Sequence, residues 1–151
     1  MKTVTAFTIA HSITLALATL GYVHVPSAPV EAAIALSIVF VAVEIVHLRQ
    51  GREGLTASAP WLVAFMFGLL HGLGFAGALN EIGLPEGQIP LALLFFNVGV
   101  EIGQLLFIAT ALCLFALVRR IRIPARWADF AAAYAIGSIA MFWVIERVAA
   151  F

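Results

Sequence analysis

The chain has 151 residues, of which 64% are hydrophobic and 11% are charged, and its mean hydropathy is +1.10. A soluble domain usually has about half apolar and about a quarter charged residues, so this composition predicts an integral membrane protein instead. The net charge of zero excludes a strongly basic surface, and we expect no nucleic-acid partner. The single cysteine, Cys113, excludes an intrachain disulfide.

Five apolar segments follow one another, and each approaches the roughly 20 residues that a membrane span requires. Lipid offers the backbone no hydrogen-bond partner, so we expect each segment to be an α-helix. All six prolines lie between the segments or in their first turns, where a missing amide costs little. The predicted fold is an all-α integral membrane bundle in one domain, residues 1–151, with spans at about 4–23, 30–48, 60–79, 90–118 and 127–149.

Positive charges are distributed unevenly over the predicted loops. Lys2, Arg49, Arg52 and the arginines of 119–126 fall on one side of the membrane, and Arg147 alone falls on the other. Because cytoplasmic loops are enriched in lysine and arginine, we expect a multi-pass protein of the cell (inner) membrane with a cytoplasmic N-terminus. The lipid bilayer is then its first partner.

The third predicted span carries one imidazole, His71, within an apolar run that is otherwise interrupted by glycines. His71 has no polar neighbour in sequence, so its partners must come from other helices. An ionisable residue at this depth is a functional-site hypothesis, because lipid does not solvate it. Two glycine pairs have the small-xxx-small spacing that permits close helix approach, namely Gly68 with Gly72 and Gly99 with Gly103.

A weak internal repeat of two helices places a histidine helix before a glutamate helix in each half. The first half carries His11 and Glu44, and the second carries His71 and Glu101. The first and third spans cross in the same direction, so the halves would be related by an axis along the membrane normal, as in some transporters. A match this short and apolar also arises by chance.

Helical spacing brings polar residues onto shared faces. Glu44 and His47 are three residues apart, and Asn97 and Glu101 are four apart. Glu-x-x-His on a helix can present two metal ligands to a bundle interior, and imidazole with carboxylate suits nickel, cobalt or zinc. We therefore predict a divalent transition-metal site formed by six intramembrane residues: His11, Glu44, His47, His71, Asn97 and Glu101.

Three classes of function remain open for these residues. A metal permease or accessory protein would pass the ion between them without nucleotide hydrolysis, because the chain has no phosphate-binding loop. A metal-dependent intramembrane hydrolase would use the same residues to activate water, but the His-Glu-x-x-His signature is absent. In a structural membrane subunit they would only link helices by hydrogen bonds. We favour the first class, which is not an enzyme, in a homo-oligomer or beside a further membrane subunit.

Four segments resemble the second branch of the HupE/UreJ membrane proteins and cover the first four spans: residues 7–15, 30–38, 67–76 and 96–104. The resemblance implies a nickel or cobalt permease, so Ni²⁺ is the expected substrate or ligand. It also implies an upstream segment of the form His-x-x-x-Gly-x-Asp-His, which the printed sequence does not contain. We therefore expect a shortened or incompletely defined form of the family's pattern.

Overall fold

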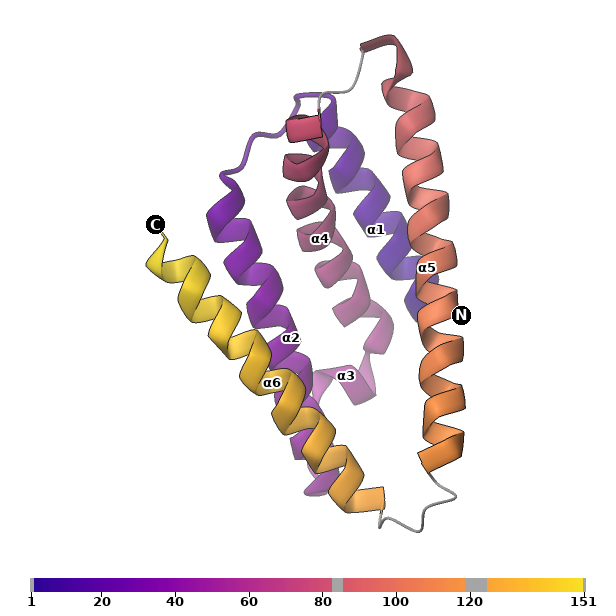
Figure 1. The fold of residues 1–151 in the computed structure, drawn as a ribbon, viewed down its shortest axis with the longest axis vertical. Helices are drawn as coiled ribbons and strands as arrows, with labels where there is room; N and C mark the ends of the chain where they lie inside the picture. Colours follow the sequence, from indigo (N-terminus) through magenta and orange to yellow (C-terminus); the bar gives the residue numbers. More distant parts are fainter. Residues whose placement is uncertain (1, 83–85, 119–124, 151) are drawn as a thin grey trace.

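The computed structural model describes residues 2–82, 86–118 and 125–150, and all regular structure in these ranges is helical. Successive long helices run in opposite directions, as Figure 1 shows. The elements are α1 (Lys2–Thr19), α2 (Ser27–Arg49), the short α3 (Leu55–Ser58), α4 (Pro60–Ile82), a 3₁₀ turn η1 (Glu86–Gln88), α5 (Ile89–Val118) and α6 (Ala125–Ala149). The predicted all-α fold class is confirmed.

Four helices of the described chain, α2, α4, α5 and α6, are long and apolar enough to cross a membrane. Helix α1 is not among them, since threonines, a serine and His11 interrupt its apolar residues. The protein is thus a multi-pass membrane protein. The arginines of 119–124 and the side chains of Arg126 and Trp127 lie outside the described residues, so their predicted place at the membrane surface stays a prediction.

Two helix ends depend on glycines with left-handed backbone angles. Gly21 has φ +81°, which turns the chain so that the Leu17 carbonyl accepts the amide of Tyr22 at 2.9 Å. Gly51 has φ +79° and ends α2 in the same manner. Helix α1 therefore ends at Thr19, before the predicted boundary at residue 23.

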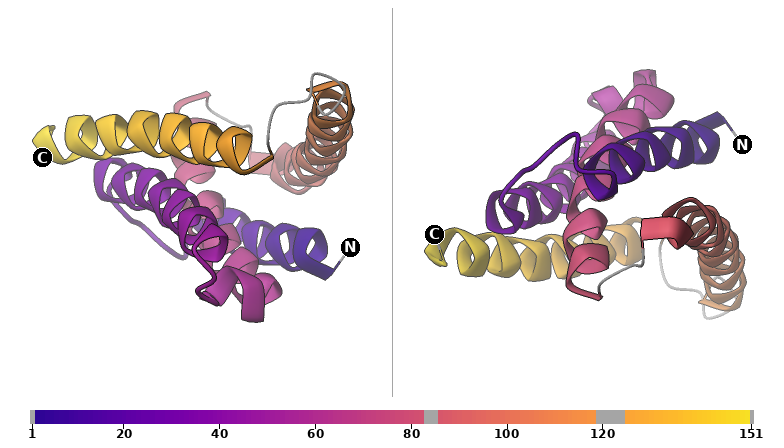
Figure 2. Two further views of the ribbon diagram at one scale, coloured as in Figure 1. Left: turned by 90° about the horizontal axis from the view of Figure 1, so that it is seen from below. Right: turned by 90° about the horizontal axis from the view of Figure 1, so that it is seen from above.

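Helix α4 lies at the centre of the bundle and contacts both α1 and α2. A Cβ atom on Gly72 would overlap Thr14 and the His11 carbonyl of α1, whereas one on Gly74 would meet Ile34 of α2 at 2.6 Å. Gly72 and Gly74 lie on different faces of α4 and have no side chains, so α1 and α2 can both approach α4 closely. Figure 2 shows α1 and α4 crossing over each other in both end views.

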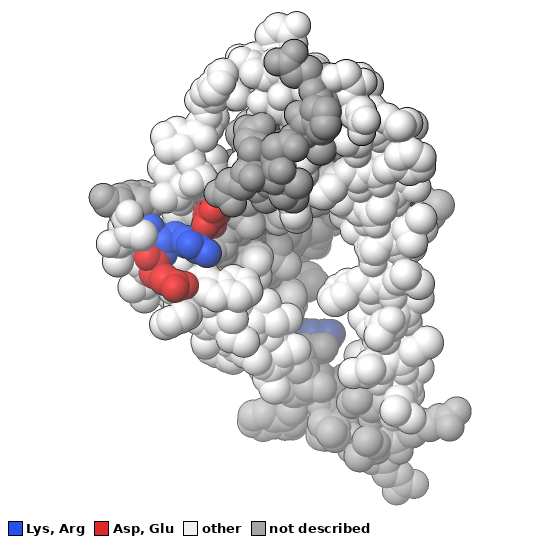
Figure 3. Space-filling view, turned by 45° about the horizontal axis from the view of Figure 1, so that its top comes forward, with Lys and Arg blue, Asp and Glu red and all other residues white. Residues whose placement is uncertain are grey.

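Helices α2 and α6 form a second closely packed pair. Ala133 and Ala140 of α6 are buried, and a Cβ on Gly137 would lie 3.1 Å from Ala42 of α2. Near the C-terminus, Arg147 Nε lies 2.9 Å from a carboxylate oxygen of Glu31. Figure 3 shows acidic and basic side chains gathered at this edge, while most of the other described residues on the visible face are uncharged.

Helix α5 stands to one side of the bundle and contacts mainly α1 (Figures 1 and 2). Leu93 joins the small core formed with Leu15, Ala76 and Leu79. Beyond Gln104 every described side chain of α5 is exposed. One long face of a membrane-spanning helix is therefore left uncovered in the single chain.

Candidate metal centre

The His11 ring is fully enclosed where α1, α4 and α5 meet, with 0% of the residue exposed. Phe7 and Phe96 stack on it with interplanar angles of 15° and 12°, and Phe75 approaches edge-on with its centroid at 5.6 Å. Aromatic rings exclude water but offer no strong hydrogen bond to an imidazole nitrogen. The polar atoms of His11 therefore depend on the few polar side chains within reach.

Asn97 fixes the tautomer of His11. Its Nδ2 donates to the Leu93 carbonyl at 2.9 Å, which orients the amide and leaves Oδ1 facing α1. Because Oδ1 can only accept, His11 Nδ1, at 3.3 Å, must carry the proton. Nε2 then bears a free lone pair, and this buried atom has no partner among the described residues. The Ser12 hydroxyl lies 2.7 Å from the same Oδ1 and 2.7 Å from the Thr8 carbonyl, and its single proton bonds to one of these acceptors at a time.

His71 has the same tautomer for a different reason. Its Nδ1 lies 2.8 Å from the carbonyl of Phe67 one turn earlier on α4, so Nδ1 is the donor and Nε2 keeps its lone pair. The ring meets the edge of Phe7, at a centroid distance of 5.3 Å, and the same Phe7 stacks on His11. The two predicted histidines are thus neighbours across the α1–α4 contact.

The carboxylate of Glu44 lies elsewhere, near the lower end of α2. Its Oε2 accepts the backbone amide of Thr56 at 2.9 Å and the Thr56 hydroxyl at 3.0 Å. A Cβ atom on Gly54 would overlap this carboxylate, so the loop before α3 closes directly around it. His47 lies one turn further along α2 and interacts with Glu44 electrostatically. Glu44 therefore holds the α2–α4 connection, and the pair is separate from His11 and His71.

The polar face predicted on α5 is divided between the bundle and its surroundings. Asn97 and Gln104 are half-buried toward α1, whereas Glu101 is exposed. Gln104 also has a buried Oε1 without a partner in the described chain. The described residues contain no group of three or more His, Cys, Asp or Glu side chains arranged around one metal position. Of the six predicted ligands, only His11, His71 and Asn97 lie in one group within a single chain.

The sequence profile of the HupE / UreJ proteins matches residues 1–147. The chain belongs to the HupE/UreJ family. This family is linked generally to nickel and cobalt transport or accessory functions and is not an enzyme family. No curated protein and no solved structure matches the chain significantly.

Sequence reasoning missed the residues that surround the histidines of this HupE/UreJ protein. Phe7 and Phe75 each lie four residues from a histidine in sequence, a spacing that places them on the same helix face and could have indicated the aromatic enclosure. No sequence pattern indicated the hydrogen bonds between Glu44 and Thr56, because Thr56 lies in a connecting segment without periodicity. Ser12, Thr14 and Ser37 do bond to their own helix carbonyls, as expected of hydroxyls in membrane helices.

Proposed function

We propose that the chain is a membrane permease or accessory protein for a divalent transition metal, with nickel as the preferred ion and cobalt next. Imidazole nitrogen is a ligand that both ions accept well. The observation that carries this proposal is that His11 and His71, on two helices in contact, each commit Nδ1–H to a fixed acceptor and keep the Nε2 lone pair free.

The surroundings of both histidines match those of metal-binding imidazoles. Such rings usually donate their second nitrogen to a carbonyl or carboxylate, which fixes the ring and raises the basicity of the ligating nitrogen. Here the Asn97 amide and the Phe67 carbonyl take that role. In the proposal His11 and His71 bind the ion, Asn97 orients His11, and Glu101, one turn further along α5, supplies negative charge nearby.

His71 borders an apolar cavity of about 220 Å³ between α1, α2, α4 and α6. His71 is the one ionisable residue that lines it among the described side chains. At a rise of 1.5 Å per residue, Glu44 lies about 8 Å along α2 from its end at Arg49. His71 lies about 17 Å along α4 from its start at Pro60, which is on the same side of the bundle. Glu44 and His47 would then bind the ion as it enters, and would not be ligands of an ion held at His11 and His71.

Isothermal titration of the purified chain with nickel, cobalt and zinc tests the proposal. Glutamine in place of either histidine keeps a polar group but cannot act as an imidazole ligand, so His11→Gln and His71→Gln should each weaken nickel binding at least tenfold. Asn97→Leu should weaken it about tenfold, as loss of an orienting partner does in other metal sites. His24→Gln, at an exposed histidine in the first loop, is the matched control and should change nothing.

The pH dependence supplies an independent measurement. A protonated imidazole cannot bind a metal, so the affinity should fall as the pH is lowered from 8 to 5. Unchanged nickel affinity in both glutamine variants, or affinity that is constant from pH 8 to pH 5, would overturn the proposal. The histidines would then serve only to link helices.

We also propose that the N-terminus is cytoplasmic in the inner membrane. In a Cys113→Ala background, a membrane-impermeant thiol reagent applied from outside should label a cysteine at Gly87 and miss one at Glu53. Glu53 is chosen rather than Gly51 because Gly51 has a positive φ that disfavours other residues. Labelling at Glu53 alone would reverse the orientation.

A further inference from the structure

Helix α5 exposes a carboxylate in the middle of its membrane-spanning length. Glu101 lies on an uncovered flank of the helix together with Val98 and Leu105. An ionisable group at this depth costs on the order of 3 kcal/mol even on insertion scales, unless it is paired or shielded from lipid. This flank of α5, which we call the Glu101 flank, therefore needs a covering surface that carries hydrogen-bond donors.

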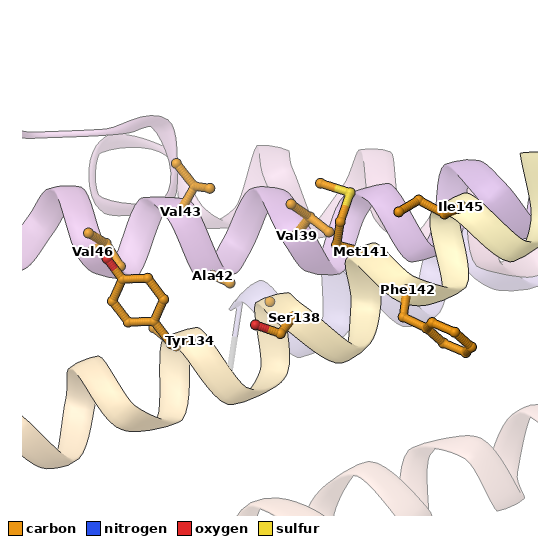
Figure 4. Close-up of a pocket in the computed structure, with 11 residues that line it drawn as sticks. Val39, Ala42, Val43, Val46, Tyr134, Ser138, Met141, Phe142 and Ile145 are labelled. Carbon is orange, nitrogen blue, oxygen red and sulfur yellow. The ribbon is translucent and has the colours of Figure 1, made fainter.

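A surface of that kind lies between α2 and α6, where an open groove has a volume of about 540 Å³. Its walls are mostly apolar, with Val39, Val43 and Val46 from α2 and Met141, Phe142 and Ile145 from α6. Two hydroxyls interrupt them, those of Tyr134 and Ser138. Figure 4 shows both on the side of α6 that faces the groove, with the Tyr134 ring extended toward Val46. Neither hydroxyl has a hydrogen-bond partner within the described ranges.

The two surfaces match in depth. Helix α5 ends and α6 begins on the same side of the bundle (Figure 1). At 1.5 Å per residue, Val98 lies about 30 Å along α5 from Val118, and Ile145 lies about 30 Å along α6 from Ala125. On the same scale Glu101 lies at about 25 Å and Ser138 at about 20 Å, within reach of a carboxylate and a hydroxyl on crossing helices, whereas Tyr134 lies at about 14 Å and is out of reach.

The geometry points to a second copy of this chain as the occupant of the groove. Helix α5 of one copy lies between α2 and α6 of the next, and the hydroxyl of Ser138 donates to Glu101. The choice of a second copy follows from complementarity, because each chain carries a carboxylate without donors in the middle of α5 and a groove with a donor at a matching depth. Within one chain α5 and the groove lie at opposite edges of the bundle (Figure 1), so Glu101 cannot reach the groove of its own chain.

Such a contact joins different surfaces of the two copies and is therefore heterologous, which produces a ring when the rotation closes. It also places Glu101 of each copy, and with it the neighbourhood of Asn97 and His11, against α6 of the next copy. The inference does not depend on metal binding, and its test contains no metal.

Disulfide formation between two differently tagged chains tests this contact. In a Cys113→Ala background one chain carries Val98→Cys and the other Ile145→Cys, so that Glu101 and both hydroxyls are retained. Oxidation with iodine in native membranes should link the two tags. Gly99→Cys is the matched control for Val98→Cys, because it lies at nearly the same depth but is turned by about 100° around the helix. It should give at least a fivefold lower yield.

The hydroxyl–carboxylate contact is tested in the same assay. Glu101→Leu on the Val98→Cys chain, and Ser138→Ala on the Ile145→Cys chain, should each lower the yield at least threefold. The two changes combined should lower it little further, because they remove the same interaction.

Three results would overturn the inference. Links between two Val98→Cys chains in place of the mixed product would indicate a symmetric α5–α5 contact. A link within one chain carrying both cysteines, without dimers, would mean that α5 covers its own groove. Absence of the disulfide between the two tagged chains, together with a monomer mass by light scattering in nanodiscs, would indicate that lipid fills the groove.

Discussion

Two glycine pairs with the same spacing have opposite surroundings in this protein. Cβ atoms added to Gly68 and Gly72 of α4 would overlap the backbone of α1, at the Phe7 and His11 carbonyls. Gly99 and Gly103 of α5 have nothing within 4 Å of the corresponding positions. The same motif therefore marks a completed helix contact in α4 and an uncovered helix in α5.

The two glutamates of the repeat differ in a parallel manner. Glu44 is enclosed by the loop that follows α2 and accepts two hydrogen bonds from Thr56. Glu101 is exposed, and α5 continues well past it to Val118, whereas α2 ends at Arg49 shortly after Glu44. The first half of the chain uses its glutamate to close a connection, while the second half leaves it available for a contact outside the chain.

The largest effect is expected at the α1–α4 contact. Gly72→Val places a branched side chain where the Thr14 hydroxyl and the His11 carbonyl now lie, and the backbone of α1 cannot move aside locally. We expect a loss of about 3 kcal/mol in the free energy of unfolding, at the upper end of what overpacking costs. Unfolding by SDS in mixed micelles measures it.

Gly103→Val is the control with the same chemical change at the same motif position. It should leave the unfolding free energy of the single chain within about 0.5 kcal/mol, as is usual for exposed substitutions. If both valine variants destabilise the chain equally, the difference between the two glycine pairs does not exist in the folded protein.

A smaller effect is expected when the two glutamates are compared. Glu44→Ala removes the acceptor of the Thr56 amide and hydroxyl and should lower the Tm by about 5 °C. Glu101→Ala removes no hydrogen bond within the described chain, and the Tm of the monomer in detergent should not change. Scanning fluorimetry on the two variants side by side gives both values.

Gly54→Ala provides a second approach to the same loop. Its Cβ would overlap the Glu44 carboxylate, so the single variant should lower the Tm. In a Glu44→Ala background the space is free, and the same substitution should be nearly neutral. Additive effects of the two changes would show that Gly54 and Glu44 do not share this site.

The helices were predictable from sequence because hydrophobic length and proline position act locally. The predicted third span, 60–79, begins at Pro60 as α4 does, and the predicted 90–118 differs from α5 by one residue at its start. Helix α3 was not predicted. Its four residues have no periodicity, and the carboxylate that binds its first turn comes from α2.

The candidate site was predictable only in part, because a shared helix face is broad. Glu101 is turned by about 40° from Asn97 around α5, and Gln104 by about 20° in the opposite sense. That difference is enough to leave Asn97 and Gln104 toward α1 and Glu101 outside. Which part of the face is covered depends on how α5 lies against α1, and that packing is not encoded in the spacing alone.

The smallest effect is expected at the ion pair between α2 and α6. Arg147 and Glu31 are 50% and 39% exposed, so solvent and salt screen their attraction. A double-mutant cycle with Glu31→Gln and Arg147→Gln should give a coupling below about 1 kcal/mol, and the coupling should fall further in 1 M salt. The contact of Ala42 with Gly137 lacks charge, and a Gly137→Leu variant should cost more than either glutamine change at any ionic strength. A coupling above 2 kcal/mol would mean that charge pairing rather than close packing holds α6 on α2. In the proposed orientation Arg147 is the exception to the positive-inside distribution, and such a value would also give this arginine a structural reason to lie on the outer side.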